Sequence, residues 1–246
     1  MKTVIINQAR MTSTRLPGKV LLTVLGKPLL EYQIERLRRV KLADGIVVAT
    51  TTNITDQPIV DLCGRLNVPC FRGSENDVLA RYYEAATLHQ ADVVVRVTSD
   101  CPIIDPDVVT EVIRYYHDHQ DCCDYVSNGL RRTYPRGMDT EVFSYKALCE
   151  AFLESTDDAD REHVTPFIYR HPERYRLANV AFREDQSRRR WTVDTAEDFE
   201  LARRIIEALY PVNKDFTLDE ILKLLDSHPD WAKVNAHVEQ KKLGEQ

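Results

Sequence analysis

Short apolar runs alternate with longer segments of helical periodicity along the first two hundred residues of the chain. The clearest run, residues 92–98, is rich in valine and ends in a polar loop, as a buried strand of a parallel sheet does. Alternation of this kind is typical of α/β proteins with a mostly parallel sheet flanked by helices. The pattern predicts strands at 4–6, 45–50, 69–72, 92–98 and 191–194, and helices that begin near 28, 56, 76, 105 and 195.

The alternation weakens after residue 120. Here we predict short strands at 125–127, 141–143 and 176–182, and helices at 145–154 and 161–169. Residues of about 121–185 would then form a small α+β lobe inserted into a main domain of residues 1–210. The remaining residues, 211–246, read as a helical C-terminal extension whose buried side carries Leu218, Ile221, Leu222 and Leu225.

Composition narrows the class of protein. The 246 residues carry a formal net charge of −6, and 43% of them are hydrophobic, which excludes intrinsic disorder. The acidic balance argues against a protein that coats nucleic acid, and no apolar stretch approaches the ~18 residues of a membrane span. We therefore expect a cytoplasmic protein with reduced cysteines and with neither nucleic acid nor membrane as a partner.

The eight glycines exclude two common phosphate-binding loops. No glycines have the spacing of a G-x-G-x-x-G turn, and Gly18, which precedes Lys19, has no partner glycine five positions earlier for a Walker loop. A phosphate site in this chain would therefore be built without a glycine nest.

The loop after the first predicted strand is the first candidate site. Ligands of open α/β sheets bind beyond the carboxyl ends of the strands, where this loop lies. Residues 8–19 contain three cations, Arg10, Arg15 and Lys19, among hydroxyl and amide side chains. One arginine side chain can donate to two phosphate oxygens at once, and lysine supplies a compact positive charge. The loop is suited to a triphosphate, although an ordinary solvated basic loop explains its composition equally well.

Two aspartates follow predicted strands far apart in the sequence, Asp100 after 92–98 and Asp194 at the end of 191–194. If the sheet brings them together, they form a carboxylate pair suited to Mg²⁺, which keeps waters and phosphate oxygens as its other ligands. For each aspartate alone, a structural role is the better explanation. Asp100 would cap a loop, and Asp194 would precede a helix N-terminus.

The segment Ala9–Lys19, ARMTSTRLPGK, resembles the N-terminal signature of the cytidylyltransferases that make CMP-activated sugars, including the CMP-Kdo synthetases. The run STRLPGK followed by an apolar pair is far more specific than a lone glycine motif. Further matches occur at 99–102, 136–143, 161–166 and 190–198. The resemblance covers most of residues 3–209 and is closest to the SpsF-like spore coat polysaccharide proteins.

This resemblance implies a Rossmann-like nucleotide-diphospho-sugar transferase fold. It also implies an Mg²⁺-dependent nucleotidyltransferase that moves CMP from CTP to a sugar, expected to be acidic, and releases pyrophosphate in polysaccharide or glycan synthesis. By the same resemblance Lys19, Arg15 and Asp100 are catalytic, and Asp100 and Asp194 hold the metal. The nucleotide-binding candidates are Ala9, Arg10, Thr12, Ser13, Arg15, Lys19, Asp77 and Ser99.

The acceptor side is less closely defined, because residues 99–102 depart from the Q-G-D-E-P turn of the CMP-Kdo synthetases. The candidates at 136, 139, 141 and 163 fit surface or dimer contacts equally well, and the basic run 188–190 is more often a solvated turn. The substrate-binding candidates are Arg81, Arg136, Asp139, Glu141, His163 and Arg190.

Two other functions are compatible with these features. A glycosyltransferase that uses a nucleotide-sugar donor would carry a D-x-D motif, whereas here Asp100 is followed by Cys101 and Pro102. A non-catalytic nucleotide-binding homologue would have little chemical reason to keep Arg15 and Lys19 beside both aspartates. By resemblance alone we expect CTP and a small sugar as partners, and a homodimer paired through the middle lobe.

Overall fold

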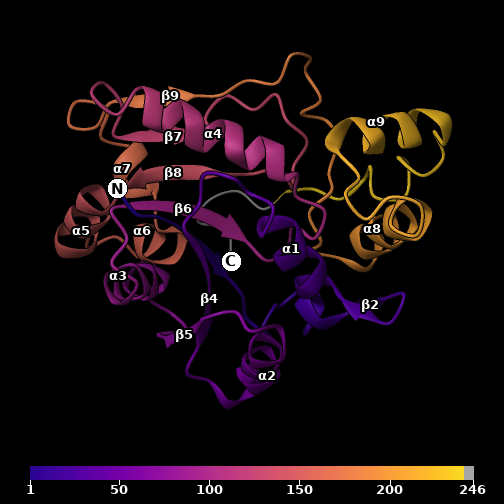
Figure 1. The fold of residues 1–246 in the computed structure, drawn as a ribbon, viewed down its shortest axis with the longest axis horizontal. Helices are drawn as coiled ribbons and strands as arrows, with labels where there is room; N and C mark the ends of the chain where they lie inside the picture. The colour runs from indigo at the N-terminus through magenta and orange to yellow at the C-terminus, as the bar shows by residue number, and fades with distance from the viewer. Residues whose placement is uncertain (241–246) are drawn as a thin grey trace.

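The computed structural model describes residues 1–240 and is built on a seven-stranded sheet of order β5-β4-β1-β6-β8-β7-β9 (Figure 1). The first four strands of that order are mutually parallel, β8 is antiparallel to both of its neighbours, and β9 is parallel to β7. The predicted α/β fold with a mostly parallel sheet is confirmed. The strands are β1 (Thr3–Gln8), β4 (Gly45–Thr51), β5 (Cys70–Gly73), β6 (Val93–Thr98), β7 (Tyr125–Ser127), β8 (Glu141–Ser144) and β9 (Leu177–Asn179), and a separate hairpin joins β2 (Thr23–Val24) to β3 (Lys27–Pro28).

The helices begin at recognisable caps. Thr195 and Thr217 each form a capping box with the residue three positions later, and these two boxes start α8 and α9. The α-helices are α1 (Leu29–Leu37), α2 (Gln57–Leu66), α3 (Val78–Leu88), α4 (Pro106–Asp118), α5 (Tyr145–Glu154), α6 (Asp158–His163), α7 (Pro166–Tyr169), α8 (Ala196–Leu209) and α9 (Leu218–Ser227), with short 3-10 helices η1 (Lys19–Leu21) and η2 (Ile54–Asp56).

Both faces of the sheet are covered, because successive residues of each strand point to opposite sides. Ile5 of β1 packs into one cluster with side chains of α1, α4, α8 and α9. Val4 and Ile6 pack on the other face against α3, α5 and α7. In Figure 1, α8 and α9 lie side by side at one edge of the molecule, so the C-terminal extension shares the main core. Its predicted buried residues Leu218, Ile221, Leu222 and Leu225 are all buried.

Three predicted elements differ from the structure. The expected strand at 191–194 is absent from the sheet, because Trp191 and Val193 donate their backbone N–H groups to loop carbonyls, at 2.8 and 2.7 Å, and not to a neighbouring strand. The expected helix at 161–169 is two helices, α6 and α7, because Val164 has a φ of 74° and Pro166 starts a new helix. The strand expected at 176–182 is only the three residues of β9.

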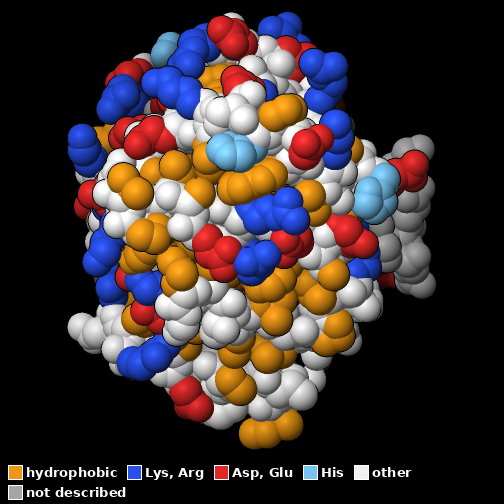
Figure 2. Space-filling model, turned by 90° about the vertical axis from the view of Figure 1, so that its right-hand side faces the viewer, with side chains coloured by type: hydrophobic (Ala, Val, Ile, Leu, Met, Phe, Trp, Pro, Cys, Tyr) orange, Lys and Arg blue, Asp and Glu red, His pale blue; other side chains and the backbone are white. Residues whose placement is uncertain are grey.

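The strands of residues 121–185, β7, β8 and β9, extend the central sheet. The face shown in Figure 2 intersperses acidic, basic and hydrophobic side chains, so neither sign of charge dominates it. Among the described residues, no helix is long and apolar enough to cross a membrane.

Candidate active site

The loop after β1 turns back so that Lys19 faces the carboxyl edge of the sheet. The N–H of Gly18 donates to the carbonyl oxygen of Met11 at 2.9 Å, which closes the loop. Gly18 has a φ of 69°, a left-handed conformation that glycine adopts without steric cost. Lys19 then begins η1, whose Val20 is buried. The start of the lysine side chain is therefore anchored in the core.

Lys19 lies between the two aspartates that follow the predicted strands. Its Nζ donates a hydrogen bond to Asp194 Oδ1 at 2.7 Å and lies 3.5 Å from Asp100 Oδ2. The exposed fractions of these side chains are 12% for Lys19, 10% for Asp194 and 24% for Asp100. Three segments far apart in the sequence thus meet at one partly open point, and we call Lys19, Asp100, Asp194 and the adjacent Arg15 the edge cluster.

Two arginines contact the other oxygen of Asp194. Its Oδ2 forms ion pairs with Arg15 Nη2 at 2.9 Å and with Arg190 Nη2 at 2.7 Å. Arg190 is buried and also donates through Nε to Asp198 Oδ1 at 2.9 Å, and Asp198 belongs to the capping box of α8 with Thr195. Arg190 therefore positions Asp194 from the helix start, whereas Arg15, 28% exposed, reaches it from the loop.

The backbone before Asp194 packs closely against two other segments, and this places Asp194 beside the end of β6. The N–H of Val193 donates to Asp100 O at 2.7 Å, and the N–H of Trp191 donates to Arg136 O at 2.8 Å. Gly137 has a φ of 102°, and a Cβ built there would lie 2.8 Å from the carbonyl carbon of Trp191. Only glycine allows this approach without a shift of the backbone.

Charges and hydrogen bonds favour the ionised form of Asp100. Burial by itself would raise the pKa of Asp100. The Lys19 ammonium and hydrogen bonds from Thr98 Oγ1, at 2.5 Å, and Cys101 Sγ, at 3.5 Å, outweigh burial and hold this pKa below its ordinary value. Burial likewise opposes the charge of Lys19, yet Asp100 and Asp194 raise the pKa of Lys19. At neutral pH the edge cluster therefore presents an ammonium group facing an ionised carboxylate.

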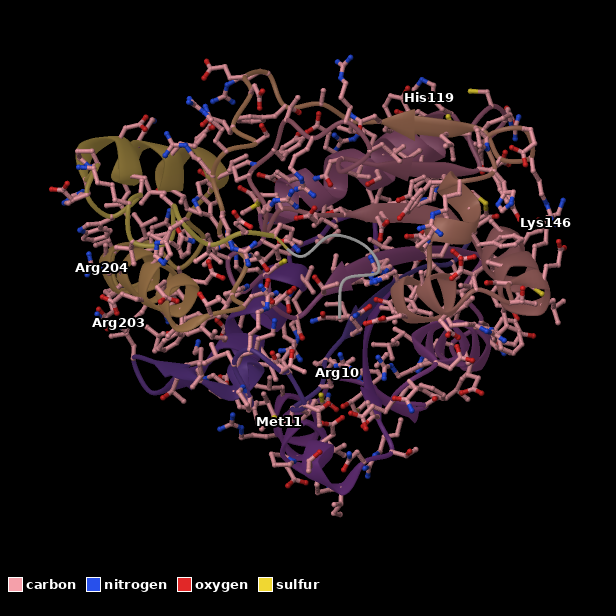
Figure 3. The ribbon with its side chains drawn as sticks, turned by 180° about the vertical axis from the view of Figure 1, so that it is seen from behind. Arg10, Met11, His119, Lys146, Arg203 and Arg204 are labelled. Atoms are coloured by element: carbon pink, nitrogen blue, oxygen red, sulfur yellow. The ribbon has the colours of Figure 1, made fainter. Side chains whose placement is uncertain are left out.

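The rest of the loop after β1 offers polar groups toward the same edge. Figure 3 shows Arg10 on this loop, exposed, and it forms no ion pair with any residue of 1–240. Thr12 Oγ1 donates to Glu75 Oε1 at 2.5 Å, and Ser13 Oγ accepts a weak hydrogen bond from a backbone N–H at 3.4 Å. Ala9 is buried, and its N–H continues the backbone pairing with β4 at 3.1 Å.

Three candidates for nucleotide or substrate binding make hydrogen bonds that stabilise the fold. Asp77 caps α3 by accepting the N–H of Ala80 at 2.8 Å, and it lies 3.6 Å from the Arg161 guanidinium. Arg81 is buried in α3, where its Nη1 donates to a loop carbonyl at 2.7 Å. Ser99 is buried and donates its N–H to β1 at 3.0 Å. Asp77 and Arg81 therefore use their side chains to hold α3 and the loop before it, and Ser99 pairs with β1 directly before Asp100.

The candidates of the middle region separate into two groups. Asp139 forms an ion pair with Arg132, and its negative charge acts to raise the pKa of Asp100. Arg136 lies near Arg132. These side chains therefore border the edge cluster. Glu141 belongs to a different group, which also includes His163, whose pKa is lowered mainly by burial.

Glu141 forms an ion pair with Arg96, its direct neighbour across β6 and β8, and we call these two residues the mid-sheet pair. Glu141 Oε1 also accepts from Tyr125 at 2.5 Å and Thr165 at 2.8 Å. We did not single out Arg96 from the sequence. Its signal is an arginine inside an otherwise apolar strand, a position that requires a buried partner.

A second missed residue is Asp56. It is fully buried and accepts hydrogen bonds from the N–H of Met11 at 2.8 Å, from Thr50 at 3.0 Å and from Thr51 at 2.6 Å. Asp56 thereby ties the loop after β1 to the end of β4. In the sequence, Asp56 is an acidic residue directly before a helix, which is common, so no local pattern indicates that it anchors the loop after β1.

Comparison with known proteins identifies the family of this chain. Residues 3–242 match the family described as cytidylyltransferase. The spore coat polysaccharide biosynthesis protein SpsF of Bacillus subtilis is 34% identical over 239 residues, which are 92% of this chain and 95% of that protein. A cytidylyltransferase from Leptospira borgpetersenii has a TM-score of 0.91 and 30% identity, covering 98% of this chain and 99% of that one. A CMP:2-keto-3-deoxy-manno-octonic acid synthetase complexed with CTP shares the fold, with a TM-score of 0.64 and 19% identity over 85% of this chain and 99% of that one. This chain therefore belongs to the cytidylyltransferase family.

Proposed function

We propose that this protein transfers CMP from CTP to a sugar and releases pyrophosphate. The observation that carries the proposal is the contact of Lys19 with Asp100 and Asp194, beside Arg15, at the carboxyl edge of the sheet. The names of the relatives, a spore coat polysaccharide protein and a synthetase complexed with CTP, support an activated sugar as the product.

The reaction needs positioning and charge neutralisation more than covalent help from the protein. A sugar hydroxyl oxygen attacks the α-phosphorus of CTP, and the new P–O bond forms as the bond from the α-phosphorus to the oxygen that bridges to the β-phosphate breaks. Pyrophosphate leaves with that oxygen, and the hydroxyl proton passes to water. Lys19 and Arg15 oppose the negative charge that grows on the departing pyrophosphate. Lys19 uses one N–H in its hydrogen bond to Asp194, so two further donors are available for phosphate oxygens.

Asp100 and Asp194 would hold Mg²⁺. Sites for Mg²⁺ and a nucleotide use one or two carboxylates and complete their shell with phosphate oxygens and water, so these two aspartates could hold the ion once Lys19 and Arg15 move from Asp194 to the phosphates. No cluster of three or more His, Cys, Asp or Glu side chains suited to a metal occurs within residues 1–240. When bound, the ion would neutralise phosphate charge and polarise the α-phosphate.

An acidic sugar is the acceptor class that suits the border of the edge cluster. Burial and the neighbouring charges of Arg132 and Arg190 lower the pKa of Arg136, so three guanidinium groups crowd this border. Asp139 pairs with Arg132, and Asp194 and Asp198 pair with Arg190, whereas Arg136 has no ion-pair partner among residues 1–240. A carboxylate on the acceptor would pair with Arg136. A homodimer paired through residues 121–185 stays a prediction, to be checked by light scattering.

The test is pyrophosphate release from CTP and Mg²⁺ with a panel of acidic and neutral sugars. We expect release only in the presence of a sugar, and nearly complete loss of turnover in Asp100→Asn, which should still unfold cooperatively with a midpoint only slightly below that of wild type. Asp92→Asn is the matched control, because Asp92 precedes the same strand at its opposite end, where it accepts the N–H of Lys2 at 2.7 Å. Close to wild-type release by Asp100→Asn would contradict the assignment.

The same assay separates the other functions. Transfer of sugar from a nucleotide-sugar donor would identify a glycosyltransferase. Binding of CTP without turnover on any sugar would indicate a nucleotide-binding protein.

A further inference from the structure

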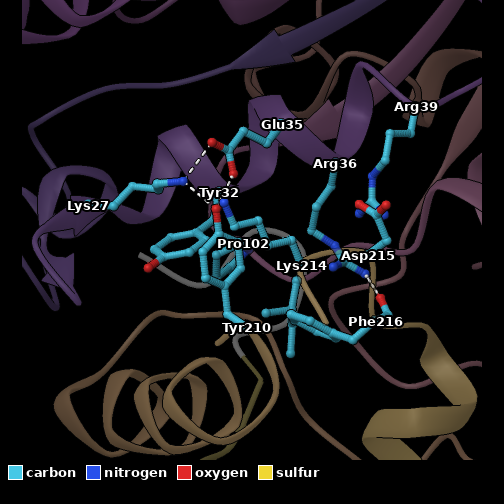
Figure 4. Close-up of a pocket in the computed structure, with 11 residues that line it drawn as sticks. Lys27, Tyr32, Glu35, Arg36, Arg39, Pro102, Tyr210, Lys214, Asp215 and Phe216 are labelled. Atoms are coloured by element: carbon cyan, nitrogen blue, oxygen red, sulfur yellow. Dashed lines mark hydrogen bonds and ion pairs between the residues drawn. The ribbon is translucent and has the colours of Figure 1, made fainter. Parts of the chain in front are cut away.

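A cavity lies between α1 and the segment that joins α8 to α9, away from the edge cluster (Figure 4). Its volume is about 250 Å³, below the range of about 300–1,000 Å³ that is usual for sites of drug-sized ligands. Pro102 and Ile103, which directly follow the loop of Asp100, form one wall. We call this cavity the α1 pocket, and any ligand that fills it is small.

The α1 pocket is lined by four cations and two carboxylates, although the whole chain has a net charge of −6. The two carboxylates are occupied by two of the cations: Glu35 accepts from Lys27 Nζ at 2.6 Å, and Asp215 accepts from Arg39 Nη1 at 2.7 Å. The other two cations are Arg36, which is buried, and Lys214, which is exposed at the rim. The excess positive charge therefore comes from these two side chains.

Arg36 is unusual because it is only 3% exposed and has no carboxylate as a hydrogen-bond partner among residues 1–240. Its Nε donates to Ile104 O at 2.6 Å and its Nη2 to Phe216 O at 2.8 Å, while Nη1 has no hydrogen-bond partner. Burial lowers the pKa of Arg36 to about 10, although the charges of Asp105, Asp215 and Glu220 act against burial, so the group is charged at neutral pH. The Arg36 side chain, which lines the cavity, thus carries a buried positive charge and an N–H donor without a partner in the described part of the chain.

The walls suit a compact anion. The Arg36 guanidinium lies 4.3 Å from the ring centre of Phe216, and Tyr32 and Tyr210 meet edge to face at 4.9 Å. Lys214 Nζ lies 5.9 Å from the ring centre of Tyr210, so both cations pack against aromatic rings, which restricts where they can lie. Figure 4 shows the Arg36 side chain reaching from α1 toward Phe216 and Lys214.

We propose that the α1 pocket is a second ligand site, which binds a small phosphate-type oxyanion between Arg36 at its buried end and Lys214 at its rim. Guanidinium and ammonium groups are the usual protein ligands of such oxyanions, and the hydrogen bonds of Arg36 within residues 1–240 go to carbonyl oxygens and not to a carboxylate. The site does not rest on the proposed function, because no residue of the edge cluster lines it. Its occupant can be inorganic phosphate or pyrophosphate, which share this chemistry.

The proposal is tested by calorimetric titration of the full chain with phosphate, and separately with pyrophosphate, at constant ionic strength. All proteins in the series carry Arg15→Gln and Lys19→Gln, which remove the cations of the edge cluster. We expect one anion bound per chain in this background. Lys214→Glu should weaken binding about 10-fold or more, because a charge-assisted hydrogen bond becomes a repulsion. Tighter binding of pyrophosphate than of phosphate would identify pyrophosphate as the natural occupant, and the reverse order would identify phosphate.

Lys223→Glu is the matched control, because Lys223 is an exposed lysine of α9 outside the pocket, and it should leave the affinity unchanged. Unfolding curves of all variants establish that they are folded. A crystal soaked with tungstate should show the ion beside Arg36. Absence of binding in the Arg15→Gln/Lys19→Gln background, equal affinity of Lys214→Glu and Lys223→Glu, or tungstate only at the edge cluster would each overturn the proposal.

Discussion

The edge cluster and the mid-sheet pair both place opposite charges on β6 or just beyond it, yet they use their hydrogen bonds differently. In the mid-sheet pair, both oxygens of Glu141 are occupied, one by Arg96 and the other by Tyr125 and Thr165. In the edge cluster, the ammonium of Lys19 makes one hydrogen bond and one longer ionic contact. The carboxylate of Glu141 is saturated, and Arg96 Nε, which has no hydrogen-bond partner among residues 1–240, is buried away from solvent, whereas the ammonium of Lys19 has N–H donors left over.

This difference separates a structural ion pair from a binding site. A buried pair whose carboxylate is fully bonded is costly to disturb and has little capacity for a ligand. The edge cluster opens to solvent at Arg15 and Asp100, which are 28% and 24% exposed, and its unused donors can bind phosphate oxygens. The comparison therefore assigns chemistry to the edge cluster and fold stability to the mid-sheet pair, although Glu141 was one of the predicted substrate ligands.

The strongest test of this comparison is Lys19→Ala. If Lys19 stabilises the departing pyrophosphate, turnover should fall about 10²- to 10³-fold, the usual loss on removing one such donor. The free energy of unfolding should change little, because Asp194 keeps its ion pairs with Arg15 and Arg190. Steady-state assays and urea unfolding measure the two effects, and Lys41→Ala, at an exposed lysine, is the control. A small loss of turnover with a large loss of stability would reverse the assignment.

Glu141→Gln should show the opposite pattern. Removing one partner of a buried pair leaves an uncompensated charge at Arg96, which costs about 3–5 kcal/mol when burial is complete. Because these side chains are 14–15% exposed, we expect the lower end of that range. Urea unfolding measures it, with the exposed Glu84→Gln as control. An unchanged unfolding free energy with a raised KM for the sugar would instead place Glu141 in the acceptor site.

Gly137→Ala tests whether the edge cluster depends on the backbone approach behind it. The added Cβ would meet the carbonyl carbon of Trp191 at 2.8 Å, at a φ of 102°, so we expect a loss of about 1–3 kcal/mol in unfolding free energy. Turnover should fall as well, because Asp194 follows this segment. Gly64→Ala is the control: its Cβ meets nothing within 4 Å, and alanine favours the helix there. Equal behaviour of the two variants would show that the approach is not needed.

The smallest expected effect is on the pH dependence of stability. The pKa of Asp100 is lower in the folded protein than its ordinary value of 3.8, so its contribution is fully present above that value and is lost as the pH falls through the lower folded pKa. The advantage of wild type over Asp100→Asn in unfolding free energy should therefore be constant above about pH 5 and shrink below about pH 4. Urea unfolding at pH 6 and pH 3 measures it, and an advantage that grows in acid would contradict the stated direction.

Much of the fold could be predicted because its signals are local. The helix Tyr145–Glu154 has the bounds expected from its pattern, and α8 begins at the capping box of Thr195. The segment 191–194 has the apolar composition of a strand, but a strand is defined by its neighbours. Here the backbone of Trp191 and Val193 bonds to loops, and no pattern within four residues carries that information.

The residues of the candidate site could be named from the sequence, but their partners could not. The run of three arginines at 188–190 is typical of a solvated turn, yet Arg190 is buried between Asp194 and Asp198. Glu141 read as a ligand, yet its oxygens are taken by Arg96 and two hydroxyl groups.

Apolar periodicity and helix caps act over a few residues, so the chain alone specified the α/β alternation, the cationic loop after β1 and the aspartates that follow apolar runs. The hydrogen bond from Lys19 to Asp194 spans 175 positions of the sequence. Which charges meet, and which donors stay unused, depends on how distant segments pack, and only the folded chain decides it.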